Sequence, residues 1–219
     1  GGLEPVQGTD AKIEYFFNTD PSMKPKLNED GTVDFFNLNM INKCTIGQVL
    51  AQLTKEDPGA PGQNVMGERG GQRDVKKLSL KYGKNISLSE DGLQLISDVQ
   101  GHVSLVDDKV FVSDIYEVTD VDTATGNIQY AGNVMVIGSV RAGFSVKADG
   151  DIEVRGAVEG ALLEAGGNII IARGVNGMNS GYLTAGGNVI AKFIENAVVS
   201  AGGYVQSEAI LHSQVSARG

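Results

Sequence analysis

The side chains able to attack a substrate or to bind zinc are few in this sequence. The one thiol is Cys44 and the two imidazoles are His102 and His212, and none of the three belongs to a known catalytic spacing. An isolated Cys in a strand-like run is usually a small buried hydrophobic residue. A zinc site would need more Cys and His ligands than are present unless carboxylates completed the set. The sequence therefore predicts no catalytic residue, no metal site and no cofactor site.

Acidic residues outnumber bases six to one over residues 107–122, a composition that suits a cation. Asp120 and Asp122 have the spacing that begins a calcium-binding loop. However, Ala124 stands where a third oxygen ligand belongs, and Ala131 stands where the loop needs a bidentate glutamate. We interpret these acids as solvated turns.

Carboxylates also recur in the second half of the chain, at Asp149, Asp151, Glu153, Glu159 and Glu164. Glycosidases use a pair of carboxylates on either side of the scissile bond. Enzymes of this kind that are built on β-helices have many more coils and aromatic residues in the sugar cleft, whereas this chain has no Trp. A carbohydrate- or cation-binding module, with hydrolysis as its extension, is therefore the alternative function.

Six bases lie within Arg69–Lys84, against Asp74 and the preceding Glu68. Tyr82 is the one aromatic residue among them, so the run lacks the aromatic interleaving of single-strand binders. The net charge of -9 also opposes binding to phosphates. We interpret the run as a solvated face or a surface for an acidic protein, and we expect no nucleic acid partner.

The last part of the chain repeats around glycines at intervals of 18, 17, 20, 16 and 16 residues. These are Gly132, Gly150, Gly167, Gly187, Gly203 and Gly219. Apolar residues recur two positions after the first five glycines, and Ala recurs two positions before the last five. The pattern predicts a solenoid of parallel strands, in which each coil contributes to the same interior layers. The variable spacing disfavours the strict hexapeptide form, so we expect a right-handed parallel β-helix of about five short coils.

The first part of the chain alternates short apolar runs with turn residues, which predicts hairpins or a meander. Residues 45–53 fit a short helix or a strand, and Gly47 favours the strand. The Pro-Gly pairs within residues 57–62 predict an exposed loop. We therefore expect an all-β chain with a β-rich domain over residues 1–125 and a β-helix over residues 126–219.

The bulk composition points to a cytoplasmic protein. A single cysteine cannot form an internal disulfide, and no apolar run of about 18 residues is present, so we expect no integral membrane segment. The chain opens on Gly1 and Gly2 without an initiator Met, and Gly219 would open a further coil. We therefore expect the β-helix to be truncated at its C-terminal end.

Several local motifs have a common resemblance. The segments Gly47–Ala51, Pro58–Gly67, Ser89–Gly92, Thr125–Ile128 and Ala191–Ala197 resemble the flagellar assembly protein A family. The coil openings are also similar to the C-terminal β-helix of the division inhibitor MinC. The resemblance implies a bacterial cytoplasmic protein with a β-rich N-terminal region and a β-helix, and it brings no catalytic residue.

From these observations we expect a non-enzymatic assembly or regulatory scaffold. Its β-helix would bind a protein partner or another copy of the chain, and a longer form would be a homo-oligomer. Partner contacts are expected at Lys192, Phe193, Glu195 and Asn196, because this segment matches a family motif and interrupts the regular coil pattern. The other interpretation of Phe193 is that it fills a corner of the coil.

Overall fold

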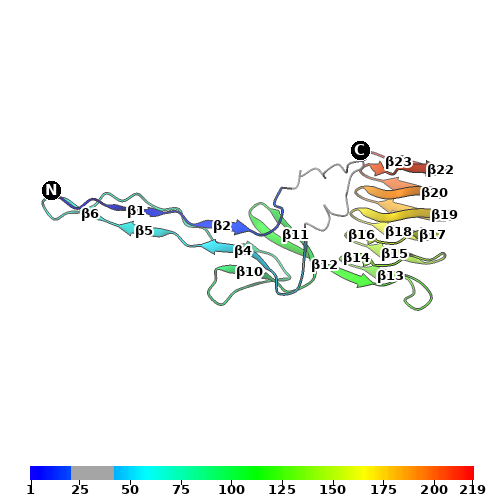
Figure 1. Cartoon of the computed structure of the whole chain (residues 1–219), viewed down its shortest axis with the longest axis horizontal. Helices are drawn as coiled ribbons and strands as arrows, with labels where there is room; N and C mark the ends of the chain where they lie inside the picture. Colours follow the sequence, from blue (N-terminus) through cyan, green and yellow to red (C-terminus); the bar gives the residue numbers. More distant parts are fainter. Residues whose placement is uncertain (21–41) are drawn as a thin grey trace. The chain divides into compact units, whose positions relative to one another are not determined.

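The computed structural model describes residues 1–20 and 42–219, and it has strands and no helix in this part of the chain (Figure 1). The described residues form two compact units, with the main division between Val112 and Ser113. The first unit contains residues 1–20 and 44–112, and the second contains residues 42–43 and 113–219. The β-rich architecture expected for the whole chain is confirmed.

Part of the first unit is an arm of paired strands. β1 (Val6–Thr9) pairs antiparallel with β5 (Asp57–Ala60), and β6 (Gly62–Gln63) pairs antiparallel with β7 (Arg69–Gly70). The Pro-Gly segment that we expected to be a loop is thus largely strand. Glycine makes this pairing possible, because a Cβ on Gly8 would lie 2.0 Å from a backbone oxygen of the opposite strand.

The rest of the first unit is a mixed sheet structure around a small core. An antiparallel sheet has the order β2 (Lys12–Tyr15), β4 (Val49–Thr54), β10 (Gln94–Ser97) and β9 (Ile86–Leu88). The helix alternative for residues 45–53 is wrong, since these residues lead into β4. Gly47 has a φ of +83°, which forms a turn before the strand instead of a helical start.

Four further strands belong to the sheet that β12 continues into the solenoid: β11 (Gly101–Val106), β12 (Lys109–Val118), β8 (Lys81–Tyr82) and β3 (Lys43–Cys44). β12 contributes residues on both sides of the division between the units. The core contains Leu50, Leu95, Val110 and Cys44, so the thiol is buried as expected for a structural residue.

The second unit is a β-solenoid of about six turns. Its strands are β13 (Ile128–Tyr130), β14 (Asn133–Val136), β15 (Ser145–Ala148), β16 (Ile152–Val154), β17 (Val158–Glu159), β18 (Leu162–Ala165), β19 (Ile169–Ala185), β20 (Val189–Ala201), β21 (Val205–Gln206), β22 (Ala209–Leu211) and β23 (Gln214–Ala217). They stack in parallel and in register as three walls. The first wall contains β14, β16 and β21, the second contains β17 and β22, and the third contains β13, β15, β18 and β23, while β19 and β20 each run through all three. The solenoid begins earlier than the glycine repeat, because Ile115–Val118 of β12 pair in register with Asn133–Val136.

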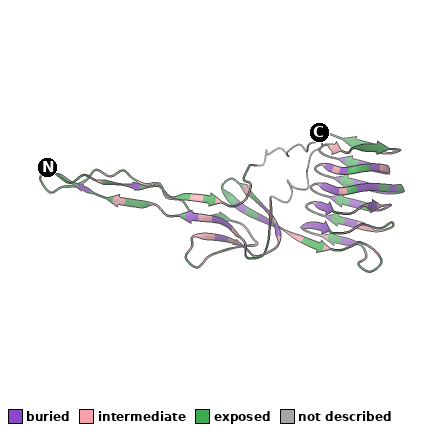
Figure 2. Ribbon diagram, in the orientation of Figure 1, coloured by how far each residue is buried: buried purple, intermediate pink, exposed green. Residues whose placement is uncertain are grey.

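The interior layers are those that the repeat predicts (Figure 2). Val134, Ile152, Ile169 and Val189 form one fully buried row along the first wall. Aligned rows of larger aliphatic residues and of Ala line the third wall: Val146, Leu163, Leu183 and Val199, then Ala148, Ala165, Ala185 and Ala201. Stacking in register therefore buries one continuous apolar core.

A ladder of side chains joins successive coils at the corner before the first wall. Each side-chain oxygen of Asn133, Asp151, Asn168 and Asn188 accepts the backbone N–H one coil further on, at distances of 2.7–3.0 Å. A glycine precedes each residue that donates the N–H, and it leaves room for the acceptor side chain from the coil below; these are Gly150, Gly167, Gly187 and Gly203. None of Gly167, Gly187 and Gly203 has a positive φ, so close packing against the coil below, and not the backbone conformation, requires the glycine.

Candidate interaction surface

The segment expected to bind a partner lies on β20, in the fifth of the stacked coils. Lys192 is exposed at the corner that leads into the second wall, and Phe193 and Glu195 point outward on either side of the buried Ile194. This alternation follows from the strand geometry, which directs successive side chains to opposite faces. Three of the four expected residues are therefore placed on the outer surface of one coil.

Phe193 lies against the coil below it. Its ring covers Gly174, where an added Cβ would lie 2.4 Å from a ring carbon, and its strand neighbour on the other side is Ala209. The side chain remains 38% exposed, so it does not fill the interior of the corner. The two small neighbours leave the ring accessible to a partner.

The exposed area around Phe193 extends into the next coil. Leu211 is 54% exposed and pairs in register with Glu195, the next outward-facing residue after Phe193 on β20. We call the group Lys192, Phe193, Glu195, Ala209 and Leu211 the Phe193 surface. It combines apolar area with one charge of each sign, a mixture that is common where proteins bind each other.

Asn196 has a role within the fold. It has a φ of +51°, and its carbonyl oxygen lies 2.2 Å from the position that a Cβ on Gly177 would take. Asn tolerates this left-handed conformation better than most residues, so it suits the corner between the second and third walls. His212 has a φ of +49° at the equivalent corner of the next coil. The position of Asn196 is therefore explained by the turn.

The carboxylates considered for sugar chemistry are spread over different walls. Glu153 is on β16 and forms an ion pair of 2.8 Å with Lys43. Glu159 is on β17 and pairs with Arg141, and Glu164 is on β18 with its oxygen 3.9 Å from the ammonium of Lys147. Because β16, β17 and β18 form three walls of one coil, these acids do not face a common substrate.

The acids considered for calcium are engaged in turns. Asp120 accepts the backbone N–H of Ser139 at 2.8 Å, and Asp122 accepts the N–H of Ala124 at 3.0 Å. Within the described ranges, no group of three or more His, Cys, Asp and Glu side chains is placed to hold a metal ion. These carboxylates stabilise corners of the first coil.

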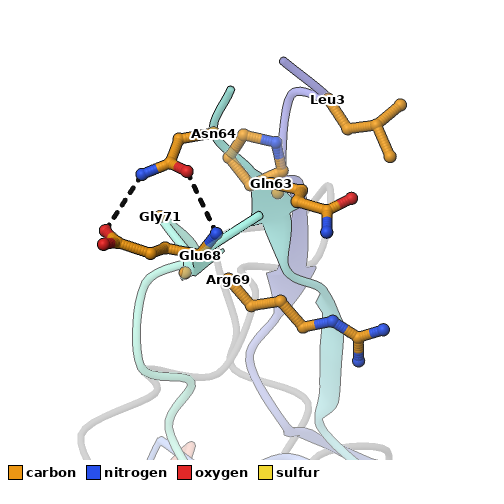
Figure 3. A pocket seen from close by; sticks show the side chains of 9 residues that line it. Leu3, Gln63, Asn64, Glu68, Arg69 and Gly71 are labelled. Atoms are coloured by element: carbon orange, nitrogen blue, oxygen red, sulfur yellow. Dashed lines mark hydrogen bonds between the residues drawn. The ribbon is translucent and has the colours of Figure 1, made fainter. Parts of the chain in front are cut away.

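A pocket of about 330 Å³ lies at the far end of the arm in the first unit (Figure 3). Asn64 organises the adjacent turn: its Oδ1 accepts the N–H groups of Met66 and Glu68, and its Nδ2 donates to the Glu68 carboxylate. The turn holds Val65 and Met66 outward, with 79% and 81% of their areas exposed. Sequence reasoning did not single out this pair, although apolar residues inside an Asn-to-Gly turn are a usable signal.

A shallow polar groove of about 590 Å³ runs along the third wall of the solenoid. Lys147, Glu164 and Thr184 from three successive coils line it. It was not expected from the sequence, because only the strand register brings these residues into one row.

The described part of the chain has no helix that is long and apolar enough to cross a membrane. A family model described as the flagellar assembly protein A beta solenoid domain matches residues 114–219, and one described as the N-terminal region of flagellar assembly protein A matches residues 1–108. Neither the curated proteins nor the solved structures contain a match to the chain.

Proposed function

The chain belongs to the flagellar assembly protein A family, and from this premise we propose that it acts as a non-enzymatic scaffold in flagellar assembly. In this proposal the solenoid binds a protein partner or a second copy of the chain through the Phe193 surface. The protein works in the cytoplasm, where its single buried thiol stays reduced.

The observation that carries the proposal is the exposure of Phe193 and Leu211 on adjacent coils of a rigid wall. Aromatic residues are enriched among those that dominate binding energy at protein interfaces. A solenoid holds such residues at fixed spacing, because every coil is hydrogen-bonded to the next along all three walls.

The distribution of functional groups within residues 1–20 and 42–219 also favours a scaffold. The five carboxylates of the alternative hypothesis are distributed over corners and separate walls, and three of them have a basic neighbour within 4.0 Å. Catalysis requires groups that meet at one reacting atom. No observation of this kind favours the carbohydrate- or cation-binding alternative.

The charge of the chain indicates the class of partner. A net charge of -9 steers the protein toward basic surfaces at moderate salt. We therefore propose a partner that offers an apolar pocket for Phe193 and basic residues around it.

The test compares two double variants in a flagellated host that depends on this protein. Phe193→Ser with Leu211→Ser removes the apolar part of the Phe193 surface. Leu162→Ser with Tyr182→Ser is the matched control, because these residues are a similarly exposed apolar pair on the third wall. Flagella are counted, and light scattering measures the mass of each purified protein.

We expect the first variant to reduce the number of flagella, or to reduce self-association, while the control retains both. Equal numbers of flagella and equal masses for the wild type and the first variant would refute docking through this surface. Thermal unfolding of both variants checks that each remains folded.

A further inference from the structure

Two lysines lie opposite each other on neighbouring strands of the first unit. In the parallel pair of β8 and β12, Lys81 is in register with Lys109, and both side chains are exposed. Paired residues project from the same face of a sheet, so the two lysine side chains leave it side by side. Like charges in this position destabilise the sheet. Across residues 1–20 and 42–219, no ion pair is formed by either lysine.

The surroundings keep Lys109 directed outward. Its ammonium lies 5.1 Å from the centre of the Phe111 ring, which favours this position through a cation–π contact. The Phe111 ring in turn lies close to Gly83, where an added Cβ would be 3.0 Å from a ring carbon. Lys77 and Lys84 are also exposed on the segment that contains Lys81.

The acids nearest in sequence are Asp107 and Asp108, in the turn before Lys109. Both have a positive φ, as a tight hairpin turn requires. The charge of Asp108 acts on Tyr15, whose pKa is raised first by burial and second by this carboxylate.

We propose that Lys81 and Lys109 form the centre of a binding site for an acidic segment of a partner protein. Carboxylates of the segment would separate the two ammonium groups and remove their repulsion, and Lys77 and Lys84 would extend the site along the segment. β8 pairs with no other strand of the described chain than β12, so an extended acidic segment has backbone groups to pair with at this edge.

A protein segment fits this site better than a single-stranded nucleic acid. Single-strand binders stack successive bases on several aromatic faces, but here the Phe111 ring has Lys109 over it and Gly83 beside it, and Tyr82 is the one aromatic residue of the basic run. The acids of the first unit outnumber its bases, so a long phosphate chain would be repelled outside the lysine cluster. The site lies in a different unit from the Phe193 surface and does not depend on it.

The test uses the full chain and a fluorescent oligoglutamate peptide, with binding followed by anisotropy at low salt and at physiological salt. Lys81→Gln with Lys109→Gln is the test variant. Lys12→Gln with Lys55→Gln is the control, because it removes the same charge from two exposed lysines of the same unit. Single-stranded poly(U) is the competing ligand.

We expect the test variant to weaken oligoglutamate binding about tenfold or more and the control to weaken it less than about twofold. Lys81→Arg with Lys109→Arg should retain binding, since both charges remain. Without ligand, Lys81→Gln with Lys109→Gln should also have a melting temperature about 2 °C above that of the wild type, because the repulsion between the two lysines is gone. An equal loss in the test and control variants, or no loss in either, would overturn the proposal. Tighter binding of poly(U) than of oligoglutamate would assign the site to nucleic acid.

Discussion

Asn168 and Gly187 occupy complementary space in successive coils of the solenoid. The Oδ1 atom of Asn168 lies 2.3 Å from the position that a Cβ on Gly187 would take. The same oxygen accepts the N–H of Asn188 at 2.8 Å. The glycine is therefore required by the side chain of the coil below, and the two residues form one structural device.

Gly187→Ala should destabilise the solenoid by about 2–3 kcal/mol, because its methyl group collides with Asn168. Asn168→Ala should cost about 1–2 kcal/mol through the lost hydrogen bond to Asn188. In the double variant the collision is gone, so adding the Gly187 change to Asn168→Ala should cost only about 1 kcal/mol. Denaturant unfolding of the four proteins measures this coupling. Additive effects of the two changes would show that the collision is not the reason for the glycine.

Lys43 and Glu153 form the most buried ion pair among the described residues. Their side chains are 13% and 5% exposed. Lys43→Met leaves a buried carboxylate without this cation and should cost about 3–5 kcal/mol. Glu153 pairs in register with Met135 on one side and Ile170 on the other. Both neighbours are apolar and buried, so an apolar residue suits the position of Glu153.

The double variant Lys43→Met with Glu153→Leu should therefore have a free energy of unfolding within about 1 kcal/mol of the wild-type value. Urea midpoints of the single and double variants provide the comparison. A double variant as unstable as Lys43→Met alone would mean that the pair stabilises the fold beyond satisfying its own charges.

The regular part of the solenoid could be predicted because its signal is local and repeated. Val134, Ile152, Ile169 and Val189 each follow a coil-opening glycine by two residues, and this spacing gave the buried row of the first wall. The first turn was missed because Asp114 stands in the row where later coils have glycine. Its strand, β12, is recognisable only from its pairing with β14.

In the first unit, the sequence indicated the basic run that contains Lys81, but it did not indicate that Lys109 lies beside this lysine. Lys81 and Lys109 are distant in sequence, and a parallel pairing of two short segments leaves no periodic signal. The sequence singled out Lys192, Phe193 and Glu195 because their segment interrupts the regular coil pattern, whereas Ala209 and Leu211 join them only through the strand register. The corner role of Asn196 could not be predicted from the sequence, because it is shown by the positive φ of this residue in the structure.

The arm of the first unit should become less stable in acid because of Asp10. The backbone N–H of Lys76 and then the guanidinium of Arg73, 2.8 Å away, lower the pKa of this carboxyl. Because the pKa of Asp10 is lowered in the fold, its ionised carboxylate stabilises the fold at pH values above the usual aspartate pKa. This contribution is lost as the pH falls through the pKa of the folded state.

Hydrogen exchange at Ala11, whose N–H is bonded to the carbonyl of Lys76, reports on this part of the arm. Asp10→Asn should speed exchange near neutral pH, and the difference in exchange rate from the wild type should shrink as the pH falls below the usual aspartate range. Asp74→Asn, which removes a negative charge from another exposed residue of the first unit, serves as the control. A difference that stays constant with pH would rule out the ionised carboxylate as its cause.

The first turn of the solenoid should lose stability in alkali because of Tyr130. Its hydroxyl donates to the carboxylate of Asp114, which raises the pKa of the phenol, and its ring stacks on Tyr116 with centroids 5.2 Å apart. The pair covers the end of the apolar core, at the row that Ala148 continues in the next coil.

A raised pKa of Tyr130 means that the fold favours the neutral phenol. This contribution is complete below the usual tyrosine range and is lost as the pH rises through the folded-state pKa. Tyr130→Phe keeps the ring and removes the titration, so it should be less stable than the wild type near pH 8, and the gap in stability should close as the pH rises beyond the usual tyrosine range. Thermal unfolding of both proteins across this range measures the gap, with Tyr182→Phe, an exposed tyrosine of the third wall, as the control. A gap that is independent of pH would assign the role of Tyr130 to its ring alone.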